Sequence, residues 1–218
     1  MKQKIYNLFR KLNLDNPLEF ARKLLAPLCK EKLNQHIISC NDCKTAKNCK
    51  KNLPKGNPDA NILIIDDNAT DDNEINEYTL NLLNIAGLTL KDVFIINSVS
   101  CVLKRELNSE TIIRLPNRQE SKNCKYFVDF AIDFVKPRYI IILGATGHDQ
   151  FKSKEYFLNV SGCNREPIKG IPTAVTYSSK DIYNMLEYED EDKINDFANE
   201  IVDTFKNAKE YIDSLERR

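Results

Sequence analysis

The sequence lacks several features that would point directly to a function. It has no tryptophan, only two histidines and no net charge, because its 32 basic residues are balanced by 32 acidic ones. A chain without net charge has no overall field to attract nucleic acid, so any contact with DNA has to come from a local basic patch. For His36 and His148 a structural or surface role is expected, which leaves little imidazole chemistry to consider.

Long apolar stretches are also absent. No run approaches the roughly 18 uncharged apolar residues that a membrane helix needs, and the first residues lack the apolar core of a signal peptide. We therefore expect a cytoplasmic protein without a membrane partner. In that reducing compartment its seven cysteines are expected to be free or bound to metal rather than joined in disulfides.

Short apolar runs alternate with helical patterns along the chain, which is typical of an α/β fold. Strands are predicted at 62–65, 93–99, 139–143 and 174–177, and helices at 5–12, 16–28, 78–86, 123–135 and 194–215. We expect one three-layer α/β/α domain over residues 1–218, with a mainly parallel four-stranded sheet. Its parts would be N-terminal helices in 1–37, a core in 38–185 and a long C-terminal helix in 186–218.

Four cysteines form a pattern suited to metal. Cys40 and Cys43 make a C-x2-C pair, and Cys101 and Cys124 follow far downstream, so a shared metal would join distant parts of the chain. Cys49 lies six residues after the pair and could replace one of its members. The spacing does not distinguish zinc from an iron–sulfur cluster, because both accept four thiolates. Cys29 and Cys163 have no partner at such spacing and are expected to be free.

Several segments together resemble a known family. They are the cysteine pair and residues 56–60, 93–101, 116–120, 136–145 and 171–177, which in this order resemble the iron–sulfur branch of the uracil-DNA glycosylase superfamily over about 38–185. The resemblance implies a 4Fe-4S cluster on Cys40, Cys43, Cys101 and Cys124. It also implies that 102–115 contains an insertion, because the family has a shorter segment between the third and fourth cysteines.

The same resemblance marks three catalytic positions and shows that two of them are altered. Asp67 stands where the family has a glutamate in a glycine- and proline-containing loop, and Ser178 stands where it has a histidine that donates to the departing base. Asn97 matches the asparagine that reads the base edge. The phenylalanine that stacks on the base has no counterpart. Because a serine stabilises a uracil anion poorly, we expect weak or absent excision.

Basic residues near the cysteines are the candidate DNA contacts. They are Lys44, Lys47, Lys50, Lys51 and Arg118, which could follow a phosphate backbone, although a solvated lysine-rich loop would look the same. The function expected is a DNA-associated, weakly active or inactive glycosylase-like subunit of a replication or repair complex. An active uracil-DNA glycosylase that uses Asp67, Asn97 and Ser178 is the alternative, and a protein–protein adaptor is a third possibility.

Overall fold

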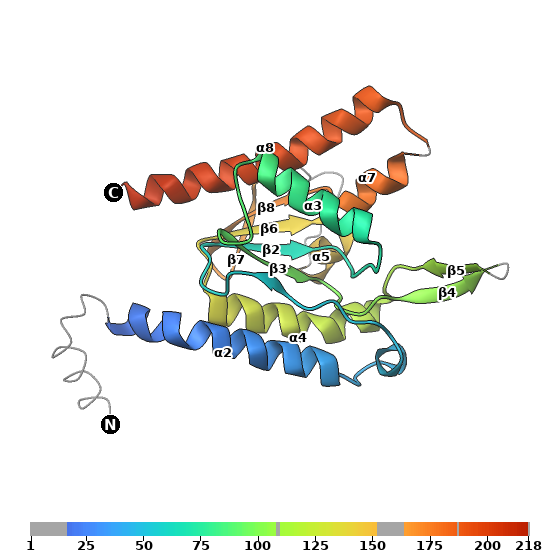
Figure 1. Cartoon of the computed structure of the whole chain (residues 1–218), viewed down its shortest axis with the longest axis horizontal. Coiled ribbons are helices and arrows are strands. Elements are labelled where there is room, and N and C mark those ends of the chain that lie inside the picture. Colours follow the sequence, from blue (N-terminus) through green and yellow to red (C-terminus); the bar gives the residue numbers. More distant parts are fainter. Residues whose placement is uncertain (1–16, 108–109, 152–163, 187, 218) are drawn as a thin grey trace.

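A mixed six-stranded sheet forms the centre of the computed structural model, which describes residues 17–107, 110–151, 164–186 and 188–217 (Figure 1). The strand order is β1-β3-β2-β6-β8-β7. The strands are β1 (Lys55–Gly56), β2 (Ile62–Asp66), β3 (Val93–Asn97), β6 (Tyr139–Leu143), β7 (Asn164–Ile168) and β8 (Ile171–Thr176). The four strands predicted from the sequence are β2, β3, β6 and β8, and they pair in parallel.

Both edges of the sheet carry an antiparallel strand that the sequence did not predict. The β1 strand has only two residues, too few to show any periodicity. The β7 strand contains Pro167 and pairs irregularly with β8, as proline in a strand is tolerated at an edge. The sheet is therefore mixed at its edges around a parallel four-stranded centre.

Helices cover both faces of the sheet (Figure 1). On one face α2 (Pro17–Ser39) and α4 (Arg118–Val135) pack through residues such as Leu33 and Val128 onto Phe94 of β3. On the other face lie α3 (Asn73–Ile85), α7 (Ser179–Met185) and α8 (Glu191–Glu216), and Phe205 of α8 packs in the same cluster as Ile141 of β6. The predicted α/β/α layers and long C-terminal helix are confirmed.

The central strands read as unbroken apolar runs because neither face meets water. Every residue of β6 is buried, and so are Ile62–Ile65 of β2. The helix expected at 16–28 continues to Ser39 through Pro27. The helix expected at 5–12 lies outside the described residues.

The insertion expected at 102–115 contains a two-stranded antiparallel hairpin, β4 (Lys104–Leu107) with β5 (Glu110–Ile113). The hairpin projects from the body of the molecule on the side of the sheet's carboxyl edge (Figure 1). A short 3-10 helix, η1 (Lys44–Lys47), and α5 (Gly144–Gln150) complete the described elements. Within the described ranges, no helix is long and apolar enough to cross a membrane.

Candidate functional site

Asp66, Asp67 and Asn97 meet where β2 and β3 end. Asp66 and Asn97 are the last residues of their strands and are register partners. The side-chain amide of Asn97 donates a 3.0 Å hydrogen bond to the backbone carbonyl of Asp67, and the Ser98 N–H donates to the Asp66 carbonyl at 2.7 Å. These bonds join the two strand ends, so part of the hydrogen-bonding capacity of Asn97 serves the fold.

The Asp67 carboxylate is buried, with 5% of the residue exposed. Burial raises its pKa, and the nearby Asp181 adds to the rise, while the Thr146 side chain and Lys180 oppose it. Its Oδ1 also accepts a 2.8 Å hydrogen bond from the Asn68 N–H. Gly144, with φ of +77°, leaves room for this carboxylate, because a Cβ there would lie 2.8 Å from Asp67 Oδ2.

Ser178 caps the start of α7. Its hydroxyl donates to Asp181 Oδ2 at 2.8 Å and accepts from the Asp181 N–H at 3.2 Å, and its own N–H donates to the same carboxylate at 2.8 Å. This capping box leaves only 1% of Ser178 exposed. The hydroxyl at the position of the family's histidine is therefore directed into its own helix.

The three predicted catalytic residues lie along the same edge of the sheet, but each is bonded into the structure. Lys180, which the sequence analysis did not predict, adds a cation there. Its Nζ donates a 2.9 Å hydrogen bond to Asn68 Oδ1, and its charge lowers the pKa of Asp67. The signal that could have found it is position, because Lys180 lies in the first turn of the helix that follows β8.

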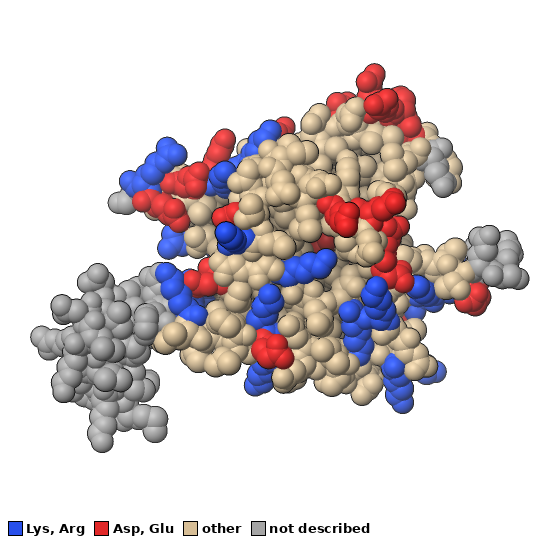
Figure 2. Space-filling model, viewed as in Figure 1, with Lys and Arg blue, Asp and Glu red and all other residues tan. Residues whose placement is uncertain are grey.

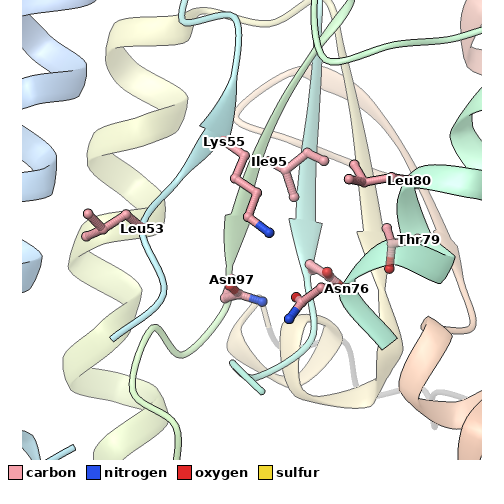
Figure 3. Close-up of a pocket in the computed structure, with 8 residues that line it drawn as sticks. Leu53, Lys55, Asn76, Thr79, Leu80, Ile95 and Asn97 are labelled. Carbon is pink, nitrogen blue, oxygen red and sulfur yellow. The ribbon is translucent and has the colours of Figure 1, made fainter. Parts of the chain in front are cut away.

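A small pocket opens beside this edge (Figure 3). It has a volume of about 20 Å³. Asp66 lines this pocket, and burial raises its pKa to about 7. The hydrogen bond from the Asp67 N–H and the charge of Lys55 lower it, but by less. Figure 3 shows Lys55 of β1 extending its amine toward Asn97 and Asn76. The residues that line the pocket are Leu53, Lys55, Asp66, Asn76, Thr79, Leu80, Ile95 and Asn97.

A wider groove of about 460 Å³ adjoins the pocket, and Leu53, Lys55 and Asn76 line both. Its walls carry four lysines and one carboxylate: Lys30, Lys50, Lys51, Lys55 and Asp71. Lys30 comes from α2, so the groove unites basic residues that are distant in the sequence. Such a cationic channel can hold an anionic chain.

The basic residues predicted to touch DNA differ in their surroundings. Lys44, Lys47, Lys50 and Arg118 are exposed. The Lys51 amine instead donates to the carbonyls of Ile38 at 2.9 Å and Cys40 at 2.8 Å, which fixes the end of α2. In Figure 2 basic atoms gather over the end of α2 and the segment after it, while acidic atoms gather over the start of α3 and the α7–α8 connection.

The four predicted cysteine ligands lie near one another. Cys101 and Cys124 are buried in a small apolar cluster, and Cys43 and Cys49 pack against it. Burial raises the pKa of Cys124 to about 12, and Cys43, Cys40 and Cys49 raise it further. Cys49 also raises the pKa of Cys101 through a hydrogen bond, although burial is the larger cause. Cys29 lies apart on α2, and Cys163 is outside the described residues.

Bonds from α4 hold the cysteine-bearing loop. The Asn123 side-chain amide donates to the carbonyl of Asp42 at 2.9 Å and to Cys43 Sγ at 3.4 Å. Among the described residues no three His, Cys, Asp or Glu side chains converge tightly enough to hold a metal ion. The thiols therefore surround a common region without closing on a single point.

The polar side chains described above lie at the carboxyl ends of the parallel strands, which is where open α/β folds bind their ligands. The model of the Uracil DNA glycosylase superfamily matches residues 53–198, and the chain belongs to this superfamily. It is 31% identical over 126 residues to a Type-4 uracil-DNA glycosylase from Sulfurisphaera tokodaii. That alignment covers 52% of this chain and 54% of the relative, so the chain spans about half of the relative's length.

Proposed function

We propose that this protein is a DNA-associated relative of the uracil-DNA glycosylases with little or no excision activity. The observation that carries the proposal is the state of Ser178, whose hydroxyl donates to Asp181 within the α7 capping box. Uracil leaves deoxyribose as an anion, so the transition state needs a donor aimed at its oxygen. Loss of one such donor typically costs about 10²- to 10³-fold in rate.

The pocket beside Asn97 supports the same proposal. Its volume of about 20 Å³ is room for about one or two water molecules, which is too little for a nucleobase. The Lys55 side chain enters the pocket (Figure 3). A base would have to displace that side chain before Asn97 could read its edge.

We also propose that Cys40, Cys43, Cys101 and Cys124 hold a 4Fe-4S cluster, with zinc as the alternative. The donor set fits, because four thiols approach one buried region. The cluster is preferred to zinc because the chain resembles a Type-4 uracil-DNA glycosylase and belongs to the same superfamily. The cluster would supply a structural link between the segment after α2 and the start of α4.

DNA would bind along the exposed lysines and Arg118. Lys44, Lys47 and Lys50 lie on the loop that carries the cysteines, and Lys50 also lines the groove. Ion pairs with phosphate would supply affinity without sequence preference. We propose that the protein binds DNA without releasing a base and acts as a subunit of a replication or repair complex.

The alternative is an active uracil-DNA glycosylase. It is favoured by the activity that names the Sulfurisphaera relative and by the Asp67 carboxylate at the end of β2, beside the cation of Lys180. Uracil release from single- and double-stranded DNA, measured on a preparation of known iron and zinc content, separates the two proposals. Release that requires Asp67 would favour the alternative; DNA binding without release supports the first. A protein that neither binds DNA nor releases uracil would be the protein–protein adaptor.

A further inference from the structure

Lys55 occupies the junction between the pocket and the groove. Two other lysines of the groove are committed to the fold: Lys30 donates to the Gly56 carbonyl at 2.9 Å and Lys51 to two carbonyls near the end of α2. In the part of the chain that the structure describes, the Lys55 amine forms no hydrogen bond, and its charge acts on the nearby Asp66 carboxylate. The primary amine of Lys55 is therefore available to react with a molecule bound at the junction of the pocket and the groove.

We propose that Lys55 captures abasic DNA by forming a Schiff base with the C1 aldehyde of a ring-opened deoxyribose. The inference rests on the proposed function, because the groove has to hold the DNA strand first. An abasic nucleotide suits the site better than an intact one. It has no base to fit into a pocket of about 20 Å³, and its aldehyde can reach the amine at the entrance.

The residues around Lys55 provide the proton transfers that this reaction needs. Asp66 Oδ1 accepts a 2.8 Å hydrogen bond from the Asp67 N–H, which leaves Oδ2 to exchange a proton. Asn76 donates to the carbonyls of Asp72 at 2.7 Å and Thr70 at 3.5 Å. Its Oδ1 therefore remains as an acceptor near the amine. The Asp66 carboxylate can accept the proton that is released when the amine attacks, and both oxygens would stabilise the iminium cation that forms later.

The steps balance without an oxidant or reductant. The Lys55 ammonium gives a proton to Asp66 and the free amine attacks the aldehyde carbon, so a C–N bond forms while the carbonyl electron pair moves to oxygen. A proton passes from nitrogen to that oxygen, which gives a carbinolamine. The carbinolamine hydroxyl then takes the proton held on Asp66 and leaves as water. The product is a protonated imine that links Lys55 to the sugar, with Asp66 again ionised.

Borohydride trapping tests the proposal. Labelled DNA containing an abasic site is incubated with the whole protein and sodium borohydride, which reduces the imine to a stable amine. Lys55→Ala and Lys55→Arg are compared with Lys91→Arg, which changes an exposed lysine that lines neither the pocket nor the groove. We expect a cross-link that falls about tenfold or more in both Lys55 variants and changes less than about twofold in Lys91→Arg. Peptide mass mapping should place the adduct on Lys55.

DNA carrying a tetrahydrofuran abasic analogue, which has no aldehyde, separates this inference from DNA binding itself. Binding of the analogue without any cross-link to true abasic DNA would overturn the inference and leave the proposed function intact. A cross-link that survives in Lys55→Ala, or that maps to other lysines, would also overturn it. If no DNA binds, labelling with 2-deoxyribose 5-phosphate decides: modification selective for Lys55 supports the amine's role, and unselective modification refutes it.

Discussion

The hydroxyl of Thr45 donates a 2.9 Å hydrogen bond to the carboxylate of Glu120, which lies 75 positions further along the chain. The same carboxylate accepts two bonds from Arg114, at 2.8 and 2.7 Å, and one from the Asn117 N–H at 2.9 Å. It therefore ties η1, between Cys43 and Cys49, to the base of the hairpin and the start of α4. These bonds, led by that of Arg114, lower the pKa of Glu120 to about 2.

Glu120→Gln should destabilise the protein by about 2 kcal/mol at neutral pH, because charge-assisted hydrogen bonds are lost in a largely buried place. A lowered carboxyl pKa stabilises the fold above the ordinary value of 4.5, and this contribution disappears as pH falls toward about 2. Urea unfolding measured across that range should therefore show a smaller pH dependence in the variant.

Asp129→Asn is the matched control for Glu120→Gln. It breaks an ion pair with Lys125, in which the side chains are 31% and 35% exposed, and a longer ion pair with Lys169 at 3.9 Å. Pairs of this kind contribute about 0.3–0.5 kcal/mol. Equal losses in the two variants would show that the Glu120 network has no special role.

Removal of a cysteine ligand tests the cluster. Anaerobically purified protein is expected to be brown with about four irons per chain, and Cys101→Ala or Cys124→Ala should lose the iron and much of the solubility. Cys29→Ala is the control, because this cysteine lies on α2 away from the others. Iron, zinc and sulfide analysis checks the prediction, and one zinc per chain in a colourless protein would contradict it.

The exposed lysines of the cysteine loop can be tested together. Lys44, Lys47 and Lys50 replaced by alanine should weaken DNA binding and reduce the slope of log K against log salt by about 0.7 to 0.9 for each phosphate that the variant no longer neutralises. Lys51 is left in place because its amine fixes the end of α2. The control replaces Lys91, Lys193 and Lys206, which are exposed elsewhere. Similar slopes for the two triple variants, measured by fluorescence titration, would refute the assignment.

The parts of this fold that could be predicted from sequence are those encoded by local patterns. The continuous apolar runs of β2 and β6 indicate strands buried on both faces. Asn117 followed by Glu120 is a capping box, and it marks the start of α4 at Arg118, five residues before the helix predicted at 123–135. The hairpin was not predicted because Lys104, Arg105 and Glu106 are charged in succession and all exposed, so β4 has no alternation of apolar and polar residues.

The pocket could not be predicted because it depends on pairing between distant strands. Lys55 is brought beside Asn97 by the antiparallel pairing of β1 with β3, in which Lys55 is the partner of Ile95. Residues two apart in a strand face the same side, so Ile95 and Asn97 share the wall that Lys55 meets. The cysteine pattern is visible in the sequence. The capping role of Ser178 was not predicted, although an aspartate three residues later, Asp181, is the sequence signal of a capping box.

Asp66 should make stability depend on pH in the opposite sense to Glu120. Its pKa is raised to about 7, mainly by burial, so its contribution is fully present below the ordinary value of 3.8 and is lost as pH rises through about 7. Asp66→Asn keeps an acceptor for the Asp67 N–H and should gain about 2 kcal/mol at about pH 8, after allowance for partial exposure. Asp71→Asn, whose parent carboxyl has a lowered pKa through Lys104, should show no such gain. Thermal unfolding of the variants at several pH values measures this effect, and a loss of stability in Asp66→Asn at about pH 8 would contradict the prediction.

The last prediction concerns the release of uracil from DNA, and it follows from the contacts of Ser178 and Asp67. The natural protein should release negligible uracil, because the Ser178 hydroxyl serves Asp181 and the Asp67 carboxylate is buried against Thr146. Ser178→His should restore activity only in part. It supplies a donor but removes a helix cap worth about 1 kcal/mol, and the 66–70 loop would still misplace the nucleotide. Single-turnover assays on uracil DNA give the measurement, with Ser178→Ala as the control for loss of the cap. Robust release by the natural protein that disappears in Asp67→Ala would mean that the buried carboxylate becomes accessible when DNA binds and that the enzyme is active.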